Sequence, residues 1–205
     1  MEENEITVKA NCSLEKLQNF LLNNGFKELE KYYFTDIFLI PGEINIYEEN
    51  TRNILKKAIL LREANGITTN RNSKKMVFKK KEINEIDEIV SQTAIKCSID
   101  SVEEAKKIFY AVGFKELMKI NELHISFIKD NFKIIVKKNI DNNYVLIEAE
   151  TNMHYKTIKE LQKKIKEIKD YIDLNDFFVK KAEIELQRIK DEGEVKNGWI
   201  LECLW

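Results

Sequence analysis

The 205-residue sequence contains one proline, six glycines, three cysteines and two histidines, and these scarcities argue against several classes of protein. The cysteines, Cys12, Cys97 and Cys203, form no Cys-x-x-Cys pair, and two histidines are too few for a zinc cluster. No apolar run approaches about 20 residues, and the acidic start M-E-E-N-E is unlike a signal peptide. The sequence therefore predicts a reduced, cytoplasmic protein without a membrane span.

The sequence also lacks an excess of positive or negative charge, since 34 basic and 35 acidic residues nearly cancel. Such a chain has no global positive field that would attract nucleic acid or an anionic membrane, although a local basic surface is compatible with this balance. We expect no nucleic-acid and no membrane partner, and the composition leaves a homodimer open. With 43% hydrophobic residues, the chain can bury a sizeable core as one domain, or as a domain with a tail.

One stretch occurs twice, at Ser13–Leu29 and at Ser101–Leu117, with the same ending Gly-Phe-Lys-Glu-Leu. In each copy a serine can cap a helix, a glutamate two residues later complements the helix dipole, and apolar residues recur at helical spacing. Gly25 and Gly113 stand where a left-handed residue would end each helix. Strand-like segments flank both copies, so the repeat predicts one domain built from two halves rather than a solenoid.

Other segments predict further elements. Residues 32–40, 57–63 and 74–82 are rich in strand formers, whereas residues 43–53 are compatible with a short strand. Beyond residue 151 an apolar stripe at helical spacing predicts a helix that packs on its own domain rather than on a coiled-coil partner. The stripe consists of Ile158, Leu161, Ile165, Ile168 and Ile172. A second helix is expected over residues 176–191, before the apolar ending W-I-L-E-C-L-W.

Five strand motifs follow one another in the sequence. They are E-I-T-V-K at 5–9, D-I-F-L at 36–39, A-I-L-L-R at 58–62, F-K at 78–79 and E-A-E at 148–150. In this order they resemble the CYTH family, the triphosphate tunnel metalloenzymes, whose motifs are Glu-x-Glu-x-Lys, Asp-x-Tyr-Phe, Ala-Leu-Arg-x-Arg, Tyr-Lys and Glu-x-Glu. The family includes thiamine triphosphatases, class IV adenylate cyclases and inorganic tripolyphosphatases.

The resemblance implies an α+β fold, in which an eight-stranded antiparallel β-barrel with a tunnel is built from two pseudo-repeated halves and flanked by helices. The implied barrel covers residues 1–152, with halves at about 5–90 and 93–152, and helices and a tail at 153–205 pack on it. Oxygen ligands suit Mg²⁺ or Mn²⁺, and basic side chains suit a triphosphate. The implied metal ligands are Glu5, Glu148 and Glu150, and the implied phosphate contacts are Lys9, Arg62 and Lys79.

Four positions depart from the family pattern. Thr7 replaces the second glutamate of the first motif, Leu60 replaces the first arginine of the third, and Glu122 and His124 replace a later Lys-x-Arg pair. His124, a lone histidine on a strand, is expected to be a surface or hydrogen-bonded residue rather than a catalyst. The catalytic resemblance is therefore partial.

Two functions are consistent with the sequence. In the first, the protein hydrolyses tripolyphosphate, thiamine triphosphate or a nucleoside triphosphate with a divalent metal, while nucleotide cyclisation is a further alternative. In the second, it is a catalytically degenerate phosphate- or nucleotide-binding module, or a protein-interaction scaffold. Charges at alternating strand positions are also compatible with solvent-facing strands, in which case the candidate side chains would not converge.

Overall fold

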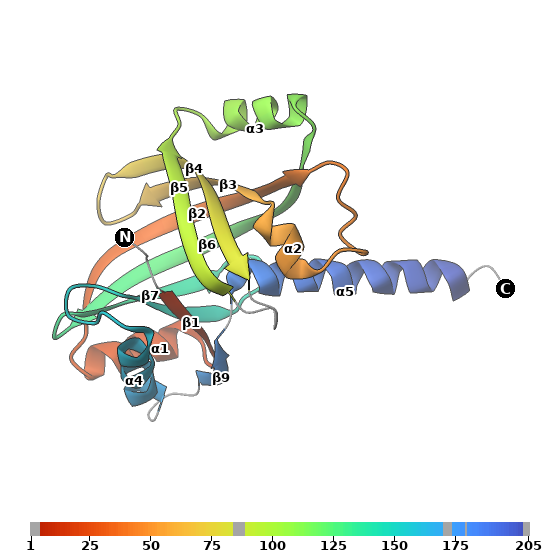
Figure 1. Ribbon diagram of the computed structural model, residues 1–205. Coiled ribbons are helices and arrows are strands. Elements are labelled where there is room, and N and C mark those ends of the chain that lie inside the picture. Colours follow the sequence, from red (N-terminus) through yellow and green to blue (C-terminus); the bar gives the residue numbers. More distant parts are fainter. Residues whose placement is uncertain (1–4, 84–88, 170–173, 179, 203–205) are drawn as a thin grey trace.

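The protein is represented by a computed structural model that describes residues 5–83, 89–169, 174–178 and 180–202. Within these residues, nine antiparallel strands form one sheet in the order β5-β4-β3-β2-β6-β7-β8-β1-β9 (Figure 1). The strands are β1 (Glu5–Ala10), β2 (Lys27–Pro41), β3 (Ile59–Gly66), β4 (Asn72–Ile83), β5 (Ile89–Ser98), β6 (Phe114–Lys129), β7 (Phe132–Asn139), β8 (Val145–Glu150) and β9 (Leu174–Phe178). The helices are α1 (Leu14–Asn23), α2 (Thr51–Lys56), α3 (Val102–Ala111), α4 (Ile158–Lys169) and α5 (Lys181–Glu202).

The sheet curls so that its two ends approach each other. Strands β4 and β1 stand far apart in the strand order, yet Lys79 Nζ of β4 lies 3.7 Å from Glu5 Oε1 of β1. The described edge strands β5 and β9 do not pair, so the hydrogen-bonded ladder is open between them. The predicted α+β class with an antiparallel sheet is confirmed. The predicted eight-stranded barrel is a curled sheet that is not closed among the described residues, and β9 adds a ninth strand.

The repeat predicted from the sequence appears as two equivalent helices, α1 and α3. The hydroxyls of Ser13 and Ser101 each accept a hydrogen bond, at 3.2 Å, from the backbone N–H three residues later. Each helix is followed by a glycine in the left-handed region, Gly25 with φ 83° and Gly113 with φ 90°. Both helices therefore start and end as the duplicated sequence predicts.

The apolar stripe of α4 is buried against the chain's own strands. Leu161, Ile165 and Ile168 belong to a core cluster with α1 and with strands β1, β6, β7 and β8. The side chain of Ile158, and Ile172 as a whole, lie outside the described residues. The domain boundary at residue 152 stays a prediction, although the packing of α4 and the pairing of β9 with β1 both cross it.

Two expectations from the sequence are wrong. Residues 43–53 form turns and the start of α2 rather than a strand, because the Asn50 side chain accepts a hydrogen bond from the N–H of Arg52 at 2.8 Å and caps that helix. The helix expected from residue 176 begins only at Lys181, because the preceding segment, β9, pairs with the edge of β1. No helix of the described residues is both long and apolar enough to cross a membrane.

Candidate active site

A cavity of about 1170 Å³ lies on the inner face of the curled sheet. Among the described residues, its wall contains eight basic and three acidic side chains. The basic ones are Arg62, Arg71, Lys75, Lys79, Lys96, Lys137, Lys180 and Lys181, and the acidic ones are Glu5, Glu148 and Glu150. Because the whole chain has a formal net charge of −1, this excess of positive side chains is local to the cavity. Such a cavity attracts an anionic ligand.

The structure brings together five of the six residues that the sequence analysis selected. Their side chains come from strands β1, β3, β4 and β8 and line one cavity instead of lying scattered around the sheet, although Glu150 is also exposed to solvent. These five are Glu5, Arg62, Lys79, Glu148 and Glu150. The sixth, Lys9, shares a face of β1 with Glu5 and Thr7 but is not part of the cavity wall. The chemical roles of all six stay a prediction.

Three carboxylates form a compact cluster at the cavity wall. Strands β1 and β8 pair so that Glu5 stands opposite Glu150 and Thr7 stands opposite Glu148. One oxygen from each of the three glutamates lies within 4.8 Å of the others. Hard oxygen donors at this spacing fit Mg²⁺ or Mn²⁺. Thr7 adds a hydroxyl instead of a fourth carboxylate, and its Oγ1 donates to Glu148 Oε2 at 3.3 Å.

Lysines from β4, from β7 and from the segment just before α5 compensate the negative charge of this cluster. Lys79 Nζ and Lys180 Nζ lie 3.7 Å and 3.5 Å from Glu5 Oε1, and Lys137 donates to Glu148 Oε2. Burial alone would raise the pKa of Glu5, but the positive charges of Lys79 and Lys180 outweigh it and lower this pKa to about 2. Glu5 is thus ionised at neutral pH, which is the form that binds a cation.

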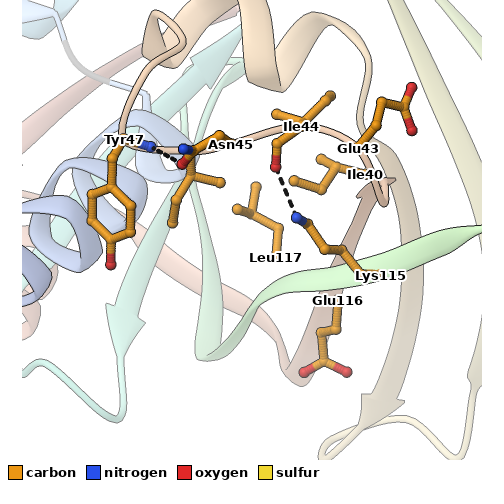
Figure 2. A pocket seen from close by; sticks show the side chains of 9 residues that line it. Ile40, Glu43, Ile44, Asn45, Tyr47, Lys115, Glu116 and Leu117 are labelled. Atoms are coloured by element: carbon orange, nitrogen blue, oxygen red, sulfur yellow. Dashed lines mark hydrogen bonds between the residues drawn. The ribbon is translucent and has the colours of Figure 1, made fainter.

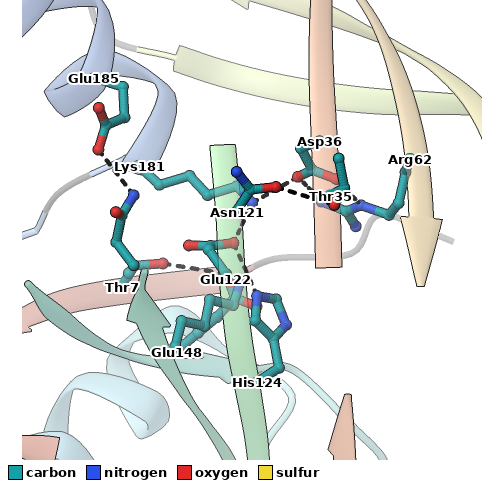
Figure 3. A network of polar contacts seen from close by, with 12 residues as sticks. Thr7, Thr35, Asp36, Arg62, Asn121, Glu122, His124, Glu148, Lys181 and Glu185 are labelled. Atoms are coloured by element: carbon teal, nitrogen blue, oxygen red, sulfur yellow. Dashed lines mark hydrogen bonds and ion pairs between the residues drawn. The ribbon is translucent and has the colours of Figure 1, made fainter. Parts of the chain in front are cut away.

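A second network joins β2, β3, β6 and the start of α5 (Figure 3). Arg62 donates to both oxygens of Asp36, with Nε–Oδ1 at 2.7 Å and Nη2–Oδ2 at 2.6 Å. Lys181 Nζ lies 2.6 Å from Asp36 Oδ2 and 2.5 Å from Glu122 Oε2, and both carboxylates are fully buried. Burial opposes ionisation of Asp36, but Lys181 and Arg62 prevail and hold its pKa far below the usual value. Arg62 is therefore fixed in orientation, and the first turn of α5 is tied to the sheet.

His124 belongs to the same network. Its Nε2 lies 2.9 Å from Glu122 Oε2, and its ring stacks on Phe34 with centroids 4.1 Å apart. Burial lowers the pKa of His124 to about 4 even though Glu122 opposes this shift, so the ring is neutral near pH 7 and donates through Nε2. Of the two expected states, surface or hydrogen-bonded, the structure shows the hydrogen-bonded one, in a buried position with His124 6% exposed.

Several site residues were not selected from the sequence. Lys137 lies on the face of β7 that lines the cavity. The alternation of side chains along F-K-I-I-V-K-K places it on the strand face opposite to Ile134 and Val136, so the sequence could have indicated this position. Lys180 and Lys181 form a basic pair at the start of α5, but no local pattern in the sequence indicates that this helix begins at the cavity wall. In the sequence, Asp36 is the first residue of the second motif and Glu122 is one of the departures from the family pattern. Neither observation predicts their burial, which depends on a cation supplied by α5.

A smaller hollow of about 330 Å³ lies beside the loop that follows β2 (Figure 2). There Lys115 Nζ donates to the carbonyl oxygens of Ile44 and Gly42 at 2.7 Å and 2.9 Å. The N–H of Tyr47 donates to Asn45 Oδ1 at 3.2 Å. The polar groups of this hollow thus bind one another and hold the loop in place. The candidate site is therefore the cavity on the inner face of the sheet.

No family description matches the sequence, and no curated protein matches it. Solved structures nevertheless share its fold. The PH1819 protein from Pyrococcus horikoshii OT3 superposes with a TM-score of 0.62 at 15% identity, over 90% of this chain and 99% of that one. A candidate adenylate cyclase from Vibrio parahaemolyticus gives 0.59 at 12% identity, over 92% and 98% of the two chains. The candidate adenylyl cyclase HpAC1 from Hippeastrum, which reveals a dominant triphosphatase activity, gives 0.56 at 12% identity, over 94% and 96%.

These similarities concern the fold alone, because all three identities are low. They include proteins of the class that the five strand motifs indicate, so the suspected CYTH fold is confirmed.

Proposed function

We propose that this protein is a metal-dependent hydrolase of a triphosphate-containing substrate, namely tripolyphosphate, thiamine triphosphate or a nucleoside triphosphate. One observation carries the proposal: three carboxylate oxygens lie within 4.8 Å of one another in the cavity wall, and Lys79, Lys137 and Lys180 form ion pairs with these carboxylates. Carboxylates gathered in this way repel one another unless cations compensate them, and a triphosphate needs the cations that surround them. The triphosphatase activity of HpAC1, which shares the fold, supports the same assignment.

In the proposed reaction, Glu5, Glu148 and Glu150 would hold Mg²⁺ or Mn²⁺. The metal would supply polarisation of a phosphoryl oxygen and activation of water. The ammonium groups of Lys79 and Lys137 exchange their carboxylate partners for phosphate oxygens and neutralise charge on the transferred group.

Basic residues at the edge of this centre have different roles. Asp36 uses two guanidinium nitrogens of Arg62, so Arg62 presents its remaining donors to phosphate in a fixed orientation. Lys180 Nζ lies 3.5 Å from Glu5 Oε1, which is close enough for Lys180 to contact a phosphate group bound beside the metal site. Lys9, outside the wall, has to move its side chain to make the phosphate contact that its motif implies. A protein with this chemistry and the reduced cysteines fits a cytoplasmic location, which we propose with the function.

Phosphate release tests the proposal directly. We expect release from at least one of tripolyphosphate, thiamine triphosphate and ATP, dependent on added Mg²⁺ or Mn²⁺. Glu148→Gln should reduce the rate by at least about a hundredfold, because it removes an anionic metal ligand at constant size. The matched control is Glu104→Gln, an exposed glutamate of α3 that pairs with Lys107 outside the cavity. Release that is equal in both variants, or independent of metal, would contradict the assignment.

A binding module without turnover is the second candidate, and one observation favours it. The cations nearest the carboxylate cluster are already paired: Lys137 with Glu148, Lys79 with Glu5, and Arg62 with Asp36. Thr7 also removes one anionic ligand from the metal site. A protein of this kind would bind a triphosphate, show no phosphate release with either metal, and keep its affinity in Glu148→Gln.

A further inference from the structure

The cations of the inner part of the cavity are matched by carboxylates of the chain itself. Each of them lies within ion-pair distance of at least one buried or half-buried acid. The cations are Arg62, Lys79, Lys137, Lys180 and Lys181, and the acids are Glu5, Asp36, Glu122 and Glu148. An anion that binds in this part of the cavity therefore has to replace existing ion pairs, or arrive together with a metal ion.

The end of the cavity at the β3–β4 hairpin is different. Arg71 and Lys75 line the cavity there, and no carboxylate of the described residues forms an ion pair with either. Lys75 stands directly opposite Arg62 in the β3–β4 ladder. It is four residues from Lys79 on the same strand face, which corresponds to about 13 Å along β4. Arg71 and Lys75 are thus cations of the cavity wall that no carboxylate of the described residues compensates.

We propose that Arg71 and Lys75 form a second anion subsite, which binds phosphate groups beyond the three held at the carboxylate cluster. The preferred substrate is then a linear inorganic polyphosphate longer than tripolyphosphate. The inference rests on the proposed function, since it places one end of a phosphate chain at Glu5, Glu148 and Glu150. Phosphates that continue toward the hairpin gain attraction from cations that need not leave a carboxylate. An uncharged nucleoside gains nothing from this charge, and the positively charged ring of thiamine is repelled by it.

Binding measurements at one fixed salt concentration test the subsite. The ligands are tripolyphosphate and a linear polyphosphate several times longer, each titrated calorimetrically with Mn²⁺ present. For the wild type we expect the longer chain to bind roughly tenfold more tightly, as two exposed charge contacts allow. The variant Arg71→Ala/Lys75→Ala should lose this gain and change the affinity for tripolyphosphate less than about twofold.

The control variant Lys74→Ala/Lys107→Ala removes the same number of charges outside the cavity. Lys74 lies on the opposite face of β4, where its Nζ donates to the carbonyl of Asp100 at 3.3 Å, and Lys107 is an exposed residue of α3. This variant should keep the preference for the longer chain. Equal affinities for both lengths in the wild type would overturn the subsite, as would equal losses for both ligands in the cavity variant or a similar loss in the control.

The subsite and the proposed hydrolase can fail separately. Metal-dependent phosphate release from tripolyphosphate without any preference for the longer chain would leave the hydrolase and remove the subsite. A length preference that depends on Arg71 and Lys75, without any release of phosphate, would keep the subsite and contradict the hydrolase.

Discussion

Replacing Lys181 by methionine removes a charge that two fully buried carboxylates share. Its Nζ lies 2.6 Å from Asp36 Oδ2 and 2.5 Å from Glu122 Oε2. Asp36 would keep Arg62 as a partner, whereas Glu122 would keep only the neutral ring of His124 among its described contacts. Breaking a buried ion pair from one side costs about 3–5 kcal/mol. Because one of the two carboxylates keeps a counter-ion, we expect Lys181→Met to lower the free energy of unfolding by about 3 kcal/mol near pH 7.

The size of this loss should depend on pH in a direction that Glu122 sets. Burial opposes its ionisation, but Lys181 and His124 lower its pKa from 4.5 to about 2 in the folded protein. For an acid with a depressed pKa, the stabilisation is complete above the unfolded pKa and is lost as the pH falls through the folded one. Without Lys181, Glu122 takes up a proton at a higher pH and its burial then costs less. The difference between variant and wild type should therefore be smaller at pH 4 than near pH 7.

Urea denaturation at both pH values measures this difference. The neighbouring variant Lys180→Met is the matched control, because its side chain is 35% exposed and lies 3.5 Å from Glu5. Its loss should stay below about 1 kcal/mol. The double variant Glu122→Gln/Lys181→Met should regain part of the stability, since it removes both partners. Equal losses in the two lysine variants, or a loss that grows as the pH falls, would refute the reasoning.

Three further predictions concern the core, the metal site and the buried histidine. Leu161→Ala should lower the free energy of unfolding by about 2–5 kcal/mol in urea denaturation, because Leu161 is fully buried. The control Leu22→Ala, at a 47% exposed position of α1, should change it by less than about 0.5 kcal/mol. Equal effects would show that α4 does not pack on the sheet. Thr7→Glu should strengthen Mn²⁺ binding in a calorimetric titration by adding a fourth carboxylate, whereas Thr7→Gln should not, and similar affinities in the two variants would contradict the metal site. The pKa of His124 is about 4 in the folded protein and 6.5 in the unfolded chain, so between these pH values the unfolded chain binds one proton more than the folded protein does. The free energy of unfolding should therefore fall by up to about 1.4 kcal/mol per pH unit as the pH drops from 6.5 toward 4. His124→Gln should reduce that slope and His154→Gln, at an exposed histidine, should not; identical slopes in all three proteins would exclude a buried neutral His124.

The parts of the site that lie on strands were predictable because strand side chains alternate between two faces. Once the opening motif fixes the inward face of β1, Glu5 and Thr7 must share it, and the same rule aligns Arg62 on β3 and Lys79 on β4. The helices of the repeat were predictable for a similar reason, since their caps and apolar spacing are written in local sequence. The pairing of strands that are distant in the chain was indicated only by the family resemblance.

The contribution of the C-terminal segment was not predictable from local patterns. The sequence N-D-F-F within β9 resembles the start of a helix, and only the available edge of β1 turns it into a strand. This pairing delivers Lys180 and Lys181 to the cavity. Their role depends on where the chain returns in three dimensions, which neither spacing nor periodicity specifies. Lys9 shares the strand face of Glu5 and Thr7 but lies outside the cavity wall, so its phosphate contact stays a prediction.

The most direct test of the central claim is calorimetric titration with a non-hydrolysable triphosphate in the presence and absence of Mn²⁺. If Glu5, Glu148 and Glu150 hold a divalent cation beside a phosphate chain, the wild type will bind the ligand more tightly with Mn²⁺ than without it. Glu148→Gln will lose that dependence, and the surface control Glu104→Gln will keep it. Binding that is absent in the wild type, or equally strong without metal and in Glu148→Gln, would contradict the claim.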